Sequence, residues 1–173
     1  MGVAGKRVAL LVAEGYNDRE FWYPYYRLKE EAVAVTVVGP QGGTGYAGKA
    51  GIRARAEKGS REVAAADFDG LIIPGGDAPE HFRRDPAMVR LAKEMAESGK
   101  VVAAICHGGL LLAAAGVLAG RTVTGFSAIR KELLEAGATF LDQEVVIDGN
   151  CITSRRPDDL PAFLRAIIKR LAG

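Results

Sequence analysis

The sequence contains few cysteines and histidines, and this scarcity limits its chemistry. Its 173 residues include two cysteines, Cys106 and Cys151, so no disulfide framework is available. Free thiols are typical of the cytosol, and we expect a cytoplasmic protein. The two histidines, His81 and His107, and the cysteines are too widely spread to suggest a metal site, so we expect no metal ion.

Long apolar runs and blocks of like charge are also missing. The apolar run from Val8 to Ala13 is too short for a signal peptide and ends at Glu14. No stretch approaches the length of a membrane-spanning helix. The net charge is +2, and lysine and arginine form no block. We therefore expect neither a membrane partner nor a nucleic-acid partner.

The composition that remains is ordinary for one globular domain. Hydrophobic residues make up 49% of the chain and charged residues 25%. A chain of this length can bury a proper core, and we expect a single domain over residues 1–173.

Apolar runs alternate with helical patterns along the whole chain. Strands are expected at residues 7–13, 32–38, 68–73, 101–105 and 121–124, with a hairpin over 144–153. Helices are expected at residues 18–31, 86–98, 109–115, 127–136 and 160–171. The alternation predicts a doubly wound, flavodoxin-like α/β sandwich with a mostly parallel sheet.

The junction after Val101–Ile105 has the pattern of a nucleophile elbow. Cys106 ends a buried strand, and Gly108 and Gly109 permit a sharp turn into a Leu/Ala-rich helix. The N-terminus of that helix favours a thiolate at Cys106. A core cysteine is the alternative reading, since free cysteine is often buried. The elbow and the adjacent His107 favour a reactive thiol.

Two other loops, near residues 14–20 and at Gly75-Gly76, are expected at the same edge of the sheet as Cys106, because ligands bind at the carboxyl ends of parallel strands. The N–H of His107 is one candidate oxyanion donor, and Gly75-Gly76 offers a second, although a plain tight turn explains these glycines equally well. Glu20 is either a dipole partner in the first turn of a helix or a carboxyl aimed at Cys106. In the second case, the like charge of a thiolate would keep Glu20 protonated.

A dinucleotide-binding pattern, G-x-G-x-x-G, occurs from Gly43 to Gly48. Its context does not fit, because Gly39-Pro40 separates it from the preceding strand and Lys49-Ala50-Gly51 does not open a helix. We therefore expect no nucleotide cofactor, and no cofactor of any other kind.

Several motifs together resemble the PfpI-type intracellular peptidases and general stress proteins. The matching segments are Tyr23-Pro24, Arg27–Glu30, Pro74–Gly76, Ala78–Glu80, Ile105–Gly108, Ala115–Leu118, Val145–Asn150, Thr153–Arg155, Pro157 and Asp159-Leu160. The resemblance covers nearly the whole chain. It places the sequence in the class I glutamine amidotransferase-like superfamily, which includes the Parkinson-associated stress protein.

The resemblance implies a role for each site residue. Cys106 would be the nucleophile, His107 its dyad partner, and Glu20 the carboxyl that hydrogen-bonds the sulfur. Gly76 and His107 would supply the oxyanion N–H groups. Glu80 would enter the site of an adjacent subunit, which requires a homodimer or a higher homo-oligomer such as a hexamer.

Three positions depart from the family pattern. Asn17 stands where relatives often carry glutamate, Gly109 where proline is common, and Phe126 where tyrosine often lies near the site. Gly75 and Phe126 are expected to contact substrate. No histidine follows His107, which excludes the triads of true amidotransferases and of α/β-hydrolases.

The expected function is that of a stress-related cysteine enzyme acting on a small carbonyl compound or a peptide. The resemblance implies three activities: peptidase, glyoxalase acting on methylglyoxal, and deglycase acting on glycation adducts. All three begin with attack by the thiolate. A deep, small pocket would favour the carbonyl activities. The alternative is a redox-sensing or chaperone-like stress protein whose cysteine is oxidised, for example to a sulfinic acid.

Overall fold

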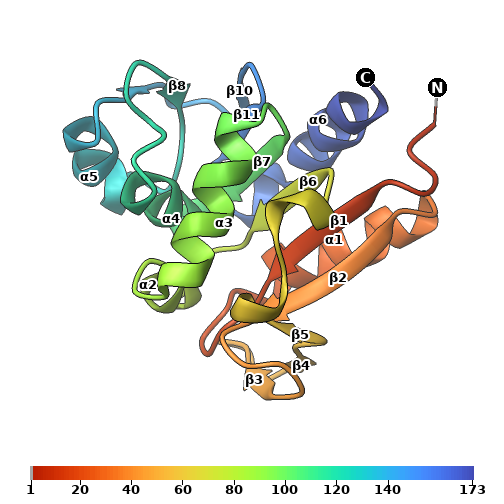
Figure 1. Ribbon diagram of the computed structural model, residues 1–173. Coiled ribbons are helices and arrows are strands. Elements are labelled where there is room, and N and C mark those ends of the chain that lie inside the picture. Colours follow the sequence, from red (N-terminus) through yellow and green to blue (C-terminus); the bar gives the residue numbers. More distant parts are fainter. Residues whose placement is uncertain (1) are drawn as a thin grey trace.

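The computed structural model describes residues 2–173, which are built around a seven-stranded sheet (Figure 1). The strands are β1 (Arg7–Leu11), β2 (Ala34–Gly39), β5 (Lys58–Gly59), β6 (Gly70–Ile73), β7 (Val101–Ile105), β10 (Val146–Asp148) and β11 (Cys151–Ser154). Their order is β10-β11-β7-β6-β1-β2-β5, and every pair is parallel except β10 with β11. The central order is that of flavodoxin-like sheets, which confirms the predicted fold class.

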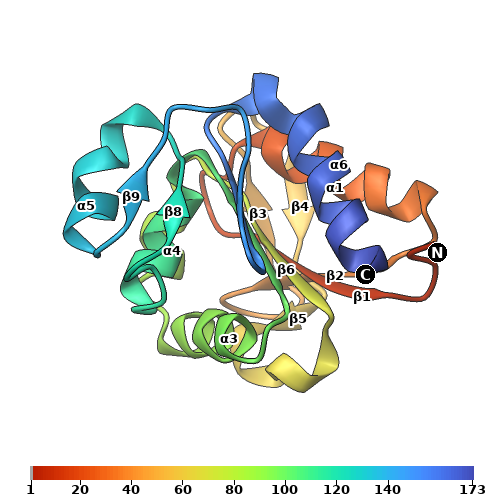
Figure 2. The ribbon, with the colours of Figure 1, turned by 90° about the horizontal axis from the view of Figure 1, so that it is seen from above.

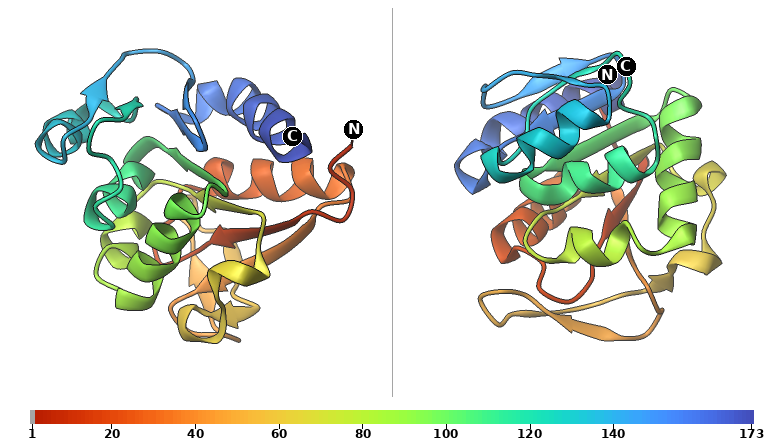
Figure 3. Two further views of the ribbon diagram at one scale, coloured as in Figure 1. Left: turned by 45° about the horizontal axis from the view of Figure 1, so that its top comes forward. Right: turned by 90° about the vertical axis from the view of Figure 1, so that its left-hand side faces the viewer.

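Helices cover both faces of the sheet. They are α1 (Asp18–Glu30), α2 (Ala78–Phe82), α3 (Pro86–Glu97), α4 (Gly109–Ala114), α5 (Arg130–Glu135) and α6 (Leu160–Ala172). Figures 2 and 3 show α1 and α6 on one face, with α3 and α4 on the other. Within residues 2–173, no helix combines the length and apolar character needed to cross a membrane.

Two smaller sheets flank the main one. The strands β3 (Gly45–Ala47) and β4 (Arg53–Arg55) form an antiparallel hairpin, and β8 (Thr122–Val123) pairs with β9 (Thr139–Phe140). The G-x-G-x-x-G stretch lies in the β3–β4 hairpin and opens no helix, as its context predicted. A dinucleotide-binding turn requires that helix N-terminus, so the motif has no such role here.

Local sequence signals set several element boundaries. The side chain of Asn17 accepts a hydrogen bond from the backbone N–H of Glu20 and caps α1, and Asp85 caps α3 ahead of Pro86. The second strand begins at Ala34 instead of Ala32, because Ala32 takes a left-handed conformation (φ 57°) as the chain leaves α1. Burial on both faces explains why β1, β6 and β7 are almost entirely apolar.

The turn after β7 has the strained geometry of an elbow. Cys106 has φ 60°, a region that non-glycine residues seldom adopt. The chain then makes a short 3₁₀ turn over Cys106–Gly108 and enters α4. A Cβ atom on Gly108 would overlap the carbonyl oxygen of Ile73, so the turn packs directly on the end of β6. These features confirm the predicted elbow at Cys106.

We expect Gly108→Ala to destabilise the elbow, because its new methyl group would meet the rigid backbone of Ile73. The free energy of unfolding should fall by about 1–3 kcal/mol, as for overpacked core sites. Gly109→Ala is the matched control, since its Cβ would meet only the tip of Leu133, at 3.2 Å. Urea unfolding of both variants checks this, and equal stabilities would contradict the assigned packing.

Candidate active site

The loops after β1, β6 and β7 meet at one edge of the sheet, as predicted. Tyr16 forms an isolated β-bridge with Gly76. The N–H of Asn17 donates to the carbonyl oxygen of Gly75 (3.0 Å), and the N–H of Asp77 donates to that of Gly15 (2.8 Å). These backbone bonds fix the Gly75-Gly76 turn against the start of α1.

Cys106 and His107 lie together at the centre of this edge. The sulfur of Cys106 is 3.2 Å from Nδ1 of His107. The backbone N–H groups of His107 and Gly76 act on the sulfur and lower the pKa of the Cys106 thiol. The ring of Phe126 lies 5.0 Å from the His107 ring and is 38% exposed. The structure therefore brings Cys106, His107, Gly76 and Phe126 together, as the sequence predicted.

Glu20 reaches the same point from α1 and is fully buried. Its Oε1 accepts a hydrogen bond from the N–H of Gly75 at 2.9 Å, and its Oε2 has no partner. A Cβ on Gly75 would lie 2.6 Å from Oε1 of Glu20 and 2.7 Å from Cβ of Cys106. Gly75 is thus more than a tight-turn residue, because only glycine allows the carboxyl and the thiol to come this close.

Burial raises the pKa of the Glu20 carboxyl to about 7. The Gly75 N–H, the charge of Arg19 and a hydrogen bond with Cys106 oppose this effect. The carboxyl is thus held neutral over much of the acidic range, as expected. The cause differs from the prediction, because desolvation raises the pKa of Glu20, whereas repulsion by a thiolate was expected to do so.

Burial of Cys106 opposes the thiolate that the helix N-terminus was expected to favour, and the thiolate stays a prediction. Cys106 is only 8% exposed, and its burial, aided by the charge of Glu20, raises its pKa to about 12. The N–H groups of His107 and Gly76 lower the pKa but do not outweigh desolvation. Burial also lowers the pKa of His107. The neutral imidazole that burial favours at His107 can accept the thiol proton when the sulfur attacks.

Glu80 is not part of the Cys106 cluster within one chain. It lies in the short helix α2 instead of at a loop tip, and its carboxylate pairs with Arg83 (2.7 Å) and Arg84 (3.7 Å). Phe82 is completely buried in its own subunit and is therefore unavailable to an interface. The role of Glu80 in a neighbouring subunit stays a prediction.

Cys151 differs from Cys106 in its surroundings. It lies on β11, is 2% exposed, and burial raises its pKa to about 11. No hydrogen bond from a histidine or a turn N–H reaches it in residues 2–173. Within the same described range, no group of three or more His, Cys, Asp or Glu side chains could hold a metal ion.

The sequence indicates a loop or hairpin over residues 41–51, but it did not predict that this hairpin borders the site. The buried carboxylate of Asp18 accepts hydrogen bonds from the N–H groups of Ala50 (2.7 Å) and Ile52 (3.2 Å). At this turn, Nζ of Lys49 lies 3.5 Å from Oδ1 of Asp77, the residue after Gly76. The glycines at 48 and 51 were the only sequence signal of a turn, and they gave no indication of its position.

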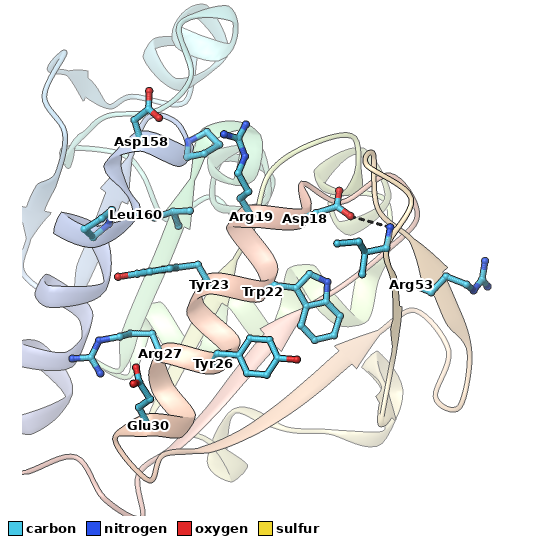
Figure 4. Close-up of a pocket in the computed structure, with 13 residues that line it drawn as sticks. Asp18, Arg19, Trp22, Tyr23, Tyr26, Arg27, Glu30, Arg53, Asp158 and Leu160 are labelled. Carbon is cyan, nitrogen blue, oxygen red and sulfur yellow. Dashed lines mark hydrogen bonds between the residues drawn. The ribbon is translucent and has the colours of Figure 1, made fainter.

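A large groove lies away from Cys106. Its volume is about 930 Å³, and it runs between α1 and the start of α6 (Figure 4). Its apolar lining includes Trp22, Tyr23, Tyr26, Ile52 and Leu160. Tyr26 is 61% exposed. The groove contains neither Cys106 nor His107, so we do not assign catalysis to it.

The fold and the site together define a class of cysteine-nucleophile proteins. Its features are an α/β sheet, a cysteine elbow, two N–H groups that act on the sulfur, and an adjacent histidine. The model of the DJ-1/PfpI family matches residues 6–170. The chain belongs to the DJ-1/PfpI family.

Individual relatives agree with this assignment. A deglycase of Pyrococcus abyssi is 43% identical over 165 residues, covering 95% of this chain and 99% of that one. YraA of Bacillus subtilis, named as a candidate cysteine protease, is 39% identical over 166 residues, covering 96% and 98%. A two-domain structure from Anabaena variabilis has DJ-1/ThiJ/PfpI-like and ferritin-like domains. It matches with a TM-score of 0.95 and 43% identity, over 96% of this chain and 48% of that protein.

Stability should depend on pH through Glu20. Its carboxyl has a pKa of about 7 when folded against 4.5 as a free group. Between these values the folded state holds a proton that the unfolded state lacks, so the free energy of unfolding falls as pH rises. The loss is on the order of 3 kcal/mol and is complete above about pH 7.

In Glu20→Gln this loss should vanish, because the amide does not titrate. Urea unfolding across this pH range, beside Glu30→Gln at the exposed end of α1, measures the difference. If the free energy of unfolding depends on pH as steeply in Glu20→Gln as in the wild type, Glu20 is ionised in the folded protein.

Proposed function

We propose that this protein is a cysteine-dependent enzyme that acts on small carbonyl compounds, as a glyoxalase or a deglycase. One observation carries the choice: Cys106 as a whole residue is only 8% exposed, whereas the open α1–α6 groove lies elsewhere. A methylglyoxal-sized molecule needs little room, but a peptide needs an open groove around the nucleophile. The deglycase name of the Pyrococcus abyssi relative supports the same choice.

The residues suit attack on a carbonyl carbon. A carbon–sulfur bond forms from Cys106, the C=O π electrons move to oxygen, and Nδ1 of His107 takes the thiol proton. The N–H groups of Gly76 and His107 are placed to hold the developing oxyanion. Glu20, with a pKa of about 7, can exchange a proton near neutral pH. Conversion of methylglyoxal to lactate then requires only the net addition of one water.

Peptidase activity is the second candidate, since YraA is named as a candidate cysteine protease. The same sulfur and oxyanion donors serve acyl transfer. The enclosed position of Cys106 makes this the weaker reading. A redox-sensing role would use the same Cys106 sulfur, and the burial that raises the pKa of this thiol acts against it.

We expect Cys106→Ser to lose at least about a hundredfold in lactate production from methylglyoxal, because it removes the attacking sulfur. The assay uses amine-free buffer, and Cys151→Ser is the matched control with wild-type activity. A fluorogenic peptide assayed with the same samples separates the two candidates. Lactate formation that survives in Cys106→Ser would refute the proposal, and peptide cleavage alone would favour the peptidase.

We further propose that the protein is a cytoplasmic homodimer or higher homo-oligomer. Both cysteines are free, which suits a reducing compartment. Exposed Tyr23, Tyr26 and Ile52 gather at the α1–α6 groove, and aromatic side chains are enriched in interface cores. The groove lining also contains both arginines and carboxylates, so two identical surfaces offer opposite charges to each other across a two-fold axis. A second contact through Glu80 would allow a larger assembly such as a hexamer.

Activity should therefore be restored by mixing two inactive variants, Cys106→Ala and Glu80→Ala. If Glu80 completes the neighbour's site, exchanged subunits regain some sites with Cys106, His107 and Glu80 all intact. Sedimentation first establishes the oligomer, and mass spectrometry of tagged subunits establishes exchange. Full activity of Glu80→Ala alone, or exchange without recovery, would refute a shared site.

A further inference from the structure

Lys49 places an ammonium group at the edge of the Cys106 site, and the chemistry above does not use it. Its Nζ lies 3.5 Å from Oδ1 of Asp77. Asp77 lies two residues after Gly75, at which a Cβ atom would be only 3.1 Å from the sulfur of Cys106. Both side chains of this pair are more than half exposed, so the bond between them is weak and exchangeable.

The backbone beneath Lys49 is held firmly although its side chain is exposed. The N–H of Lys49 donates to the carbonyl oxygen of Tyr16 at 2.9 Å, and Gly48 pairs with Tyr16 in an isolated bridge. The buried Asp18 carboxylate binds the next residues of the turn, and a Cβ on Gly48 would overlap it. This firmly held backbone keeps the exposed ammonium group of Lys49, with its weak partner Asp77, at the edge of the site.

Lys49 is the cation whose charge acts on the sulfur of Cys106. Lys49 lowers the pKa of both Cys106 and His107. The facing acids are Glu20 of α1, which raises the pKa of Cys106, and Asp77, Glu80 and Glu132, which raise that of His107. Of these, Glu80 and Glu132 are paired with one arginine, Arg83, and are thereby partly neutralised.

We propose that Lys49 is a specificity-determining residue that favours substrates carrying a negative charge, such as a carboxylate, beside the carbon attacked by Cys106. The substrate anion takes the place of Asp77 as the partner of the ammonium group. The inference rests on the proposed function in one respect, because it takes Cys106 as the attacking atom. The inference adds a substrate class to the proposed function, because it predicts that anionic carbonyl compounds are preferred to neutral ones of equal size.

The test compares alkylation of Cys106 by iodoacetate and by iodoacetamide, which differ in charge but react with the same thiolate. The thiolate fraction cancels in the ratio of the two rate constants. The ratio therefore reports the electrostatic potential that the incoming reagent meets. In Lys49→Met we expect the iodoacetate-to-iodoacetamide ratio to fall about threefold or more, with a smaller effect at high salt. Lys49→Arg should keep the wild-type ratio, and Asp77→Asn should raise it.

The matched control is Lys93→Met, which removes an exposed lysine charge from α3. Peptide mapping assigns the label to Cys106 in each sample. A ratio unchanged in Lys49→Met, or reduced equally in Lys93→Met, overturns the role of Lys49 and leaves the nucleophile in place. A Cys106 that reacts with neither reagent at any pH contradicts the proposed nucleophile, and the inference falls with it.

Discussion

The site depends on one close approach, that of the Gly75 backbone to both Glu20 and Cys106. The N–H of Gly75 donates to the buried Glu20 carboxyl at 2.9 Å, and a side chain at position 75 would collide with both partners. This contact joins the loop after β6 to the helix after β1 and to the elbow after β7. Because the three strands are parallel neighbours, their ends arrive at the same edge and need only a residue without Cβ to touch.

Burial at this contact sets the ionisation of the whole site. Desolvation raises the pKa of Glu20 to about 7 and that of Cys106 to about 12, and it lowers that of His107. All three groups are therefore shifted toward their neutral forms. The N–H groups of His107 and Gly76 have little charge to stabilise at rest, and they gain their effect when negative charge develops during attack. Such a site carries little charge before substrate binds and develops its charge during the reaction.

The fold was predictable because each local sequence pattern indicates the same arrangement of strands and helices. Apolar strands bounded by charge, the Asp85-Pro86 start of α3 and the Asp-Gly turn of the β10–β11 hairpin all act over a few residues. The elbow at Cys106 was predictable for the same reason, since strand, cysteine and glycines are adjacent. Element boundaries were less certain, as Ala32 shows, because the end of a helix can use conformations that the residue type does not announce.

The sequence by itself determined the α/β class, the family and the convergence of Glu20, Gly75-Gly76, Cys106 and His107, because chain order dictates which loops leave one sheet edge. Only the tertiary structure decided how deeply Cys106 is buried, that Phe82 is buried, and that Lys49 lies beside Asp77. Each of these depends on the amount of solvent removed from a group, or on contact between segments far apart in the chain. Neither quantity is encoded in a short run of residues, since both arise when the whole core packs.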